Sequence, residues 1–151
     1  MLETLDTVRT LQRKLYLKAK REPTFRFYAL YDKVYRHDIL EKAYRLVRSS
    51  NGSPGIDDVS FKMGEQGVGI NQFLTELGKD LKEGTYKASP VMRVMIPKSD
   101  GGQRPLSIPI IKDRVAQMAV KLVIEPIFES DFVETSYGFR PKKGAHDAIN
   151  E

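Results

Sequence analysis

The sequence predicts an α+β fold in which helices precede and follow one β-hairpin. Three stretches of the 151-residue chain carry apolar residues at helical spacing, over about 2–20, 70–83 and 112–128. Between the last two, apolar residues alternate with Arg93 over 92–96, turn residues follow at 99–102, and a second strand returns over 103–108. We therefore expect a helical N-terminal part, then a hairpin, then a long helix.

The first fifty residues are expected to form two helices. Five apolar side chains of the first lie on one helical stripe: Leu2, Leu5, Val8, Leu11 and Leu15. Proline disfavours a helical residue before it, so this helix should end at Glu22-Pro23. A second helix is expected over about 26–48, with an apolar face of Leu30, Val34, Leu40, Ala43, Leu46 and Val47.

Aromatic residues are concentrated in and just before this second helix: Phe25, Phe27, Tyr28, Tyr31, Tyr35 and Tyr44. Arginine and lysine residues interleave with these rings, a pattern that would suit stacking on unpaired bases. Core or interface packing is the commoner use of such rings, and both interpretations stay open here.

Glycine and proline mark the turns of the central region. Residues 49–55 contain Asn-Gly and Pro-Gly and predict a loop. Asp57 and Asp58 follow, and carboxylates in this position are usually turn or capping residues rather than metal ligands. A second turn is expected over 64–69, and the helix over 70–83 should end at Gly84.

The segment after the hairpin has the clearest helical pattern in the chain. Its apolar residues at near-ideal spacing are Val115, Met118, Ala119, Leu122, Val123 and Ile127. Pro126 is expected to bend or tighten the last turn. Residues 130–141 predict a loop, and Gly144 precedes a further helix in which capping explains His146 and Asp147 better than an acid–base pair does.

Composition favours an anionic partner and excludes several kinds of site. The net charge is +5, and residues 1–50 hold 12 Lys and Arg against 6 Asp and Glu, so the basic excess is N-terminal. Two explanations fit this excess equally well: the cations bind phosphate groups of a partner, or they are ordinary charges on helix surfaces that face water. The absence of cysteine excludes disulfides and thiolate metal sites, and His37 and His146 show no metal-ligand spacing. With no apolar run near 18 residues and no signal peptide, we expect a cytoplasmic protein without a membrane partner.

The turn of the hairpin is the best candidate for a phosphate site. Lys98 and Arg104 flank it, with two glycines between them, so the tip can approach a polyphosphate closely. Arginine grips phosphate with two parallel hydrogen bonds and lysine acts as a point charge. The alternative is a solvated turn with ordinary surface charges.

Two long phrases resemble a known family. Residues 96–114 (Ile-Pro-Lys-Ser-Asp-Gly-Gly-Gln-Arg-Pro-Leu-Ser-Ile-Pro-Ile-Ile-Lys-Asp-Arg) and 136–149 (Ser-Tyr-Gly-Phe-Arg-Pro-Lys-Lys-Gly-Ala-His-Asp-Ala-Ile) resemble the fingers and early palm of group II intron reverse transcriptases, the intron-encoded maturases. The resemblance covers roughly residues 20–151 and is strongest from 90 to 149. It implies a helical extension over 1–86 and a fingers hairpin with the start of the palm over 87–151.

The same resemblance implies roles for individual residues. It implies that Lys98 and Arg104 contact the triphosphate of an incoming deoxynucleotide, and that Arg140 lines the nucleotide and template side. It also implies that Ile108 and Pro109 pack near the templating base pair, although plain core packing is nearly as good an explanation. In the loop, the residues implied to contact the template strand are Asn51, Gly52 and Gly55.

Further cations are expected to bind RNA on grounds of charge and position. On the first two predicted helices these are Arg13, Lys14, Lys18, Lys20, Arg45 and Arg48. At the start of the long helix, Lys112 and Arg114 either contact the template backbone or cap the hairpin. Arg114 is also placed for an ion pair with a palm carboxylate.

The family's catalytic aspartate motifs do not occur in these 151 residues. We therefore expect the N-terminal piece of a longer RNA-directed DNA polymerase, with no catalytic or metal-binding residues of its own and with Mg²⁺ needed only by the complete enzyme. Two other classes stay open: a non-catalytic RNA-binding module that assists splicing, and a fragment that docks on a separate palm or forms a homodimer. Retroelement and defence-associated reverse transcriptases share the fingers phrase, but the Gly-rich loop and residues 136–141 favour the intron type.

Overall fold

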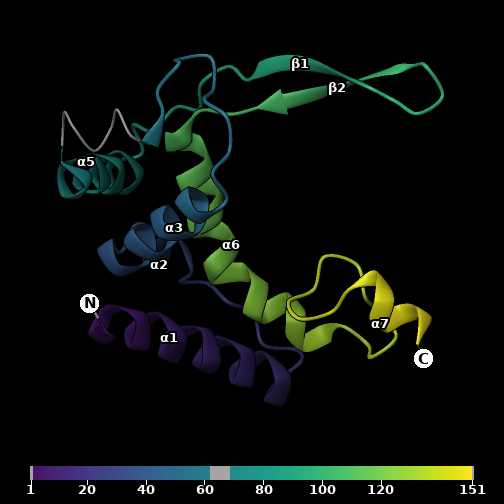
Figure 1. Ribbon diagram of the computed structural model, residues 1–151. Coiled ribbons are helices and arrows are strands. Elements are labelled where there is room, and N and C mark those ends of the chain that lie inside the picture. The colour runs from purple at the N-terminus through teal and green to yellow at the C-terminus, as the bar shows by residue number, and fades with distance from the viewer. Residues whose placement is uncertain (1, 62–68, 151) are drawn as a thin grey trace.

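A computed structural model of the chain describes residues 2–61 and 69–150. Its helices and strands are α1 (Leu2–Arg21), α2 (Tyr31–Val34), α3 (His37–Ser49), α5 (Ile70–Glu83), β1 (Met92–Pro97), β2 (Gln103–Ile108), α6 (Ile111–Asp131) and α7 (Ala145–Ile149). Helix α6 forms the spine of the molecule, with the β1–β2 hairpin at its N-terminal end and the segment that carries α7 at its C-terminal end (Figure 1). The α+β class is confirmed.

One hydrophobic core joins the helices. Helices α1 and α3 both pack along α6, and α5 packs against α3. The fully or nearly fully buried side chains of this core include Val8, Ile39, Leu40, Leu74, Leu77, Val115 and Val123. Because these residues come from both sides of residue 86, the core spans the two expected ranges, and the division at 86/87 stays a prediction.

The first and last long helices agree with the sequence pattern. Val8 and Leu15 of α1 are buried and Leu11 packs against the core, whereas the side chains of Leu2 and Leu5 lie outside the described set. In α6 the predicted apolar stripe is buried or packs against the core. Pro126 lies inside α6, which continues past it to Asp131.

The prediction of one helix over 26–48 is wrong. Residues 24–30 are not helical, α2 is a single turn, and the chain is extended at Arg36 before α3 begins at His37. A tertiary contact replaces helical periodicity here, because Phe27 packs on the core; the neighbouring Phe25 ring packs edge to face on Phe27 at 4.9 Å. Leu46, expected on the apolar face, is exposed.

Asp38 fixes the start of α3. Its carboxylate accepts hydrogen bonds from Arg36 Nε (3.0 Å), from Thr7 Oγ1 on α1 (2.9 Å) and from the Ile39 backbone amide (2.9 Å). Burial raises the pKa of Asp38, but the hydrogen bonds from Arg36 and Thr7 outweigh it and hold the pKa below its ordinary value. The ionised carboxylate therefore joins α1 to α3.

The pH dependence of unfolding should report this junction. Since the folded-state pKa is lowered, the stabilisation is complete above the unfolded pKa of about 3.9 and is lost as the pH falls through the folded value. We expect Asp38→Asn to lower the free energy of unfolding at pH 7. Near pH 2 the free energies of unfolding of the variant and the wild type, both measured by urea titration, should be nearly equal. An equal deficit at both pH values would contradict a role for the charge.

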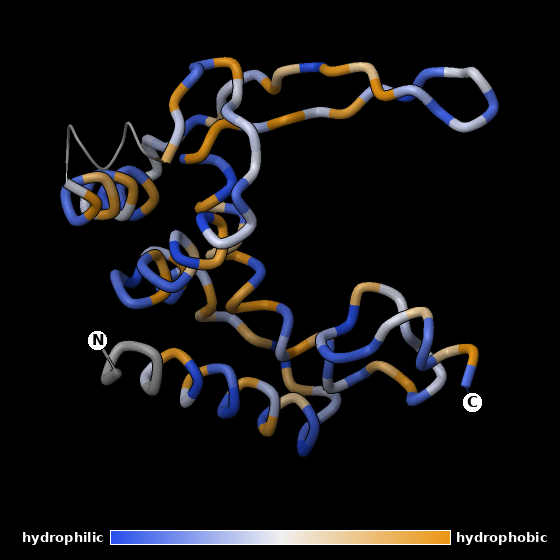
Figure 2. The backbone as a smooth tube through the Cα atoms, in the orientation of Figure 1, coloured by the Kyte–Doolittle hydropathy of each residue, from blue (hydrophilic) through white to orange (hydrophobic). Residues whose placement is uncertain are grey.

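The central turns and the hairpin form as expected. Gly84 ends α5 in the left-handed conformation (φ 71°), and Asp57 accepts a turn hydrogen bond from the Val59 amide (3.2 Å). The turn expected over 64–69 lies outside the described residues, apart from Gly69 at the start of α5. Figure 2 shows hydrophobic residues along both strands of the hairpin and hydrophilic residues at its tip. None of the helices in the described ranges is long and apolar enough to cross a membrane.

Candidate nucleic-acid interface

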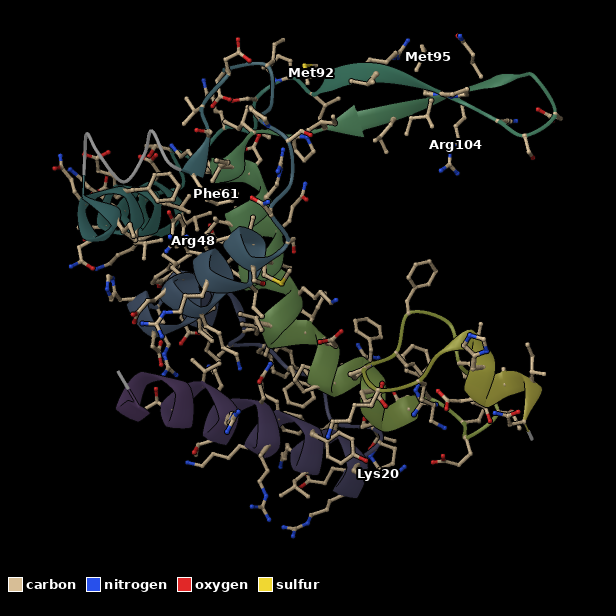
Figure 3. All side chains as sticks on the ribbon, viewed as in Figure 1. Lys20, Arg48, Phe61, Met92, Met95 and Arg104 are labelled. Atoms are coloured by element: carbon tan, nitrogen blue, oxygen red, sulfur yellow. The ribbon has the colours of Figure 1, made fainter. Side chains whose placement is uncertain are left out.

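The register of the hairpin places Lys98 and Arg104 on one face. Antiparallel pairing sets Ile96 opposite Arg104, and the Lys98 amide donates to the Gly102 carbonyl (2.7 Å). Because side chains alternate between faces with a period of two, Ile96, Lys98 and Arg104 share a face. Arg104 points to the side of the hairpin that faces α7 in this view, and Met95 points to the other side (Figure 3).

Both hairpin cations are available to a ligand. Lys98 and Arg104 are exposed, and neither has an ion-pair partner within residues 2–61 and 69–150. The turn is tight, with Gly101 in the left-handed conformation (φ 83°) and the Gly102 amide donating to Asp100 Oδ1 (2.9 Å). The predicted phosphate site therefore has the expected geometry, and its ligand stays a prediction.

The first turn of α6 holds the base of the hairpin. Asp113 is 3% exposed and accepts a hydrogen bond from the Tyr86 hydroxyl and another from the Ser89 amide (2.9 Å), just before β1. Burial raises the pKa of the Tyr86 phenol, and its hydrogen bond to the Asp113 carboxylate raises it further. Sequence reasoning missed Asp113, although an acidic residue in the first turn of a helix that follows a hairpin is a recognisable signal.

Lys112 and Arg114 have different partners on either side of Asp113. The Lys112 ammonium binds Asp80 Oδ2 on α5 (2.7 Å), and this hydrogen bond lowers the pKa of Asp80. Arg114 donates from Nε to the Pro109 carbonyl (2.8 Å) and from Nη2 to the Ser53 carbonyl. Arg114 therefore contacts the hairpin base, whereas Lys112 is bound to α5; template contact by either residue and an ion pair of Arg114 with a palm carboxylate stay predictions.

The glycine loop lies directly against this turn. A Cβ atom on Gly55 would be 2.8 Å from the Ile110 Cα atom, and one on Gly52 would be 2.8 Å from Arg114 Nη1. Asn51 has a left-handed backbone (φ 44°) and is exposed. Gly55 therefore serves close packing, while Asn51 and Gly52 stay at the surface. Ile108 and Pro109 are half-buried at the hairpin base.

Several predicted RNA-binding cations are engaged within the protein. Lys18 binds Glu22 (2.6 Å), Arg45 binds Glu41, and Lys20 donates to the Ser130 carbonyl near the end of α6 (3.1 Å; Figure 3). Arg48 is exposed at the end of α3. By contrast, Arg13 and Lys14 are exposed and have no hydrogen-bond or ion-pair partner in the described part of the chain.

Two further cations, Arg9 on α1 and Lys42 on α3, were missed from the sequence. Lys42 on α3 is half-buried and donates to Gln12 Oε1 on α1 (3.3 Å). Burial and the nearby charge of Arg9 both lower the pKa of Lys42. We call Arg9, Arg13, Lys14 and Lys42 the basic seam. Only the fold brings Lys42 to α1, so no spacing in the sequence could have revealed it.

The expected nucleotide contact of Arg140 is not favoured. Its guanidinium is 5% exposed and binds Glu129 (2.7 Å) together with the carbonyls of Val133 and Ser136 (each 2.8 Å). The hydrogen bond and charge of Glu129 raise the pKa of Arg140. Arg140 therefore closes the loop after α6, and its donors face protein atoms.

The aromatic candidates are mostly structural. Tyr44 is buried against Phe61 and Phe73, and the Tyr31 hydroxyl donates to the Leu81 carbonyl (2.7 Å). Tyr28 is 89% exposed, and the Tyr31 and Phe25 side chains are also exposed, at 57% and 41%. Asp147 accepts a hydrogen bond from the Gly144 amide (2.8 Å), which confirms its capping role.

The described residues include no group of three or more histidine, aspartate or glutamate side chains that could hold a metal ion.

Comparison with known proteins found similarity to several proteins, although no family model matches the chain. Protein YkfC of Escherichia coli K12 is 40% identical over 92% of this chain and 36% of its own length. The group II intron-encoded protein LtrA of Lactococcus lactis is 34% identical over 82% of the chain and 20% of its own length. The putative COX1/OXI3 intron 2 protein of Saccharomyces cerevisiae is 35% identical over 71% of the chain and 12% of its own length. The chain thus spans about a third or less of the length of these relatives.

Proposed function

Because this chain belongs to the group II intron-encoded reverse transcriptases and maturases, we propose that it binds RNA through the basic seam and presents the hairpin cations to a nucleotide triphosphate. RNA binding is the function proposed for the chain by itself. The triphosphate contact of Lys98 and Arg104, and polymerisation with Mg²⁺, are proposed for a complete enzyme that also has catalytic aspartates.

The observation that carries the proposal is the lack of carboxylate partners in the basic seam. Lys18 and Arg45 are neutralised by glutamates, whereas the four seam cations form no ion pair with the side chains described over 7–61 and 69–150. Lys42 is also partly desolvated beside Arg9, an arrangement that an added anion would relieve. Phosphodiester groups supply such anions at regular spacing, and their binding releases counterions.

RNA affinity as a function of salt tests the proposal, with a structured group II intron RNA as the probe. We expect the triple variant Arg9→Gln, Arg13→Gln, Lys14→Gln to bind more weakly. Each lost phosphate contact should lower the slope of log K against log salt by about 0.7–0.9, so the slope should fall by about two to three.

A matched control removes the same charge from engaged cations, as Lys18→Gln, Lys20→Gln, Arg45→Gln. We expect a smaller loss of affinity from this control, because those side chains already bind protein groups. Equal losses in the two triple variants would show that RNA affinity depends on the overall positive charge and not on the basic seam. Weak wild-type binding without salt dependence would refute RNA binding itself.

A further inference from the structure

Proline at position 126 leaves one carbonyl of α6 without its helical donor. In an α-helix each backbone amide donates to the carbonyl four residues earlier, and proline has no amide hydrogen. Pro126 lies inside α6, so the Leu122 carbonyl lacks the hydrogen bond that residue 126 would otherwise supply. Because Leu122 is buried (6% exposed), an unpaired carbonyl at this position would cost free energy.

Helix α1 supplies the missing donor. Gln12 is half-buried, and its Nε2 atom donates to the Leu122 carbonyl (3.0 Å). Further along α1, the Lys20 ammonium donates to the Ser130 carbonyl (3.1 Å). Ser130 provides one of the last four carbonyls of α6, which have no amide donor within the helix. Both bonds therefore go from α1 to carbonyls that α6 itself leaves unpaired.

The donors and the acceptors are matched in spacing. Gln12 and Lys20 are eight residues apart on α1, and Leu122 and Ser130 are eight residues apart on α6. At 1.5 Å per residue, both separations are about 12 Å along the helix axis. The two bonds therefore fit one placement of α1 along α6. Buried polar contacts of this kind can fix a helix register that apolar packing alone would leave less well defined.

The same glutamine amide joins this contact to the basic seam. Its Oε1 atom accepts a hydrogen bond from Lys42 Nζ on α3 (3.3 Å), while its Nε2 atom donates to Leu122. The donor and acceptor ends of an amide are distinct, so one orientation of Gln12 serves both partners. The placement of α1 thus determines where its three seam cations lie relative to Lys42.

We propose that Pro126 creates the docking position for α1 on α6, and that Gln12 is the positioning residue that holds the α1 cations of the basic seam at a fixed place relative to Lys42. The docking rests on contacts within the fold. Its effect on RNA rests on the proposed RNA-binding function, and the two parts are tested separately.

A double-mutant cycle between positions 12 and 126, measured by urea denaturation, tests the docking. Gln12→Met keeps the length of the side chain and removes the donor, whereas Pro126→Ala returns an amide hydrogen to the Leu122 carbonyl. We expect Gln12→Met to raise the equilibrium constant of unfolding about three- to tenfold in the wild type, but only about twofold in Pro126→Ala.

Lys20→Met is the matched control for the cycle. It also removes a donor from α1, but the Ser130 carbonyl has no amide donor in α6 whether residue 126 is proline or alanine. Its effect on the equilibrium constant should therefore be the same in both backgrounds. Equal losses for Gln12→Met in the two backgrounds would overturn the docking role of Pro126.

RNA affinity tests the positioning of the seam. Gln12→Met changes no charge, and we expect it to weaken binding of the structured group II intron RNA about two- to fivefold. The control is Gln72→Met on exposed α5, where the Gln72 amide donates to Glu76 (3.0 Å) far from the seam in sequence, and its affinity should equal that of the wild type.

The outcomes separate the two parts of the proposal. A coupled cycle with unchanged RNA affinity of Gln12→Met would overturn the positioning of the seam, even if the seam triple variant binds weakly. If the wild type bound no RNA, the proposed function and the positioning would both be overturned, while the cycle would still decide the docking.

Discussion

Replacing Asp113 with alanine is expected to cause a large loss of stability, about 2–4 kcal/mol in the free energy of unfolding. The carboxylate is 3% exposed, and its removal leaves the Tyr86 hydroxyl and the Ser89 amide without their acceptor. Both donors are partly buried, so losing their acceptor leaves part of their desolvation cost uncompensated. Urea denaturation measures this loss, and hydrogen exchange at Ser89 should rise with it.

Tyr86→Phe is the matched control, because it removes one donor and leaves the Asp113 carboxylate bound to the Ser89 amide. Its cost should be smaller, about 1 kcal/mol. If Asp113→Ala unfolded no more easily than Tyr86→Phe, the carboxylate would not be the anchor of the hairpin base.

Gly55→Ala should have the next largest effect, a loss of about 1–3 kcal/mol in the free energy of unfolding. The new Cβ atom would lie 2.8 Å from both the backbone nitrogen and the Cα atom of Ile110, and neither can turn aside as a side chain can. The loop over 49–60 must then move away from α6. Urea denaturation gives the stability, and exchange of the loop amides reports the displacement.

Gly138→Ala serves as the control for added bulk, because no atom lies within 4 Å of the position that its new methyl group would take and its backbone is not left-handed. We expect it to be within about 0.5 kcal/mol of the wild type. A similar loss in both alanine variants would show that the contact with Ile110 is not the cause of the destabilisation.

Local signals in the sequence were sufficient for most helices and for the hairpin. The stripe of α6, the glycine after α5 and the turn residues at 99–102 each act over a few neighbours, and the structure agrees with all three. Residues 24–30, just before α2, were wrongly predicted as helix because their side chains pack on distant residues, as Phe27 and Leu30 do on the hydrophobic core.

The candidate site was harder to predict, because ion pairs within the protein decide which cations can still bind a ligand. Lys18 and Lys14 look alike in the sequence, yet Lys18 binds Glu22 and Lys14 is unpaired in the described residues. Lys42 reaches α1, and Arg140 turns inward to Glu129, only after the helices have packed. The resemblance located the hairpin cations. Which of the other cations already bind groups of the protein, and which do not, is visible only in the three-dimensional structure.

The two carbonyls bound by Arg114 belong to different segments, Ser53 in the glycine loop and Pro109 at the hairpin base. One side chain thus joins the glycine loop to the hairpin base, so moving either segment away from the other breaks one of its hydrogen bonds. A ligand that orders the loop reduces the entropy still to be lost when a second ligand orders the hairpin. Linkage makes this advantage reciprocal, so RNA held at the loop and a triphosphate held at the hairpin would each strengthen the binding of the other by the same factor.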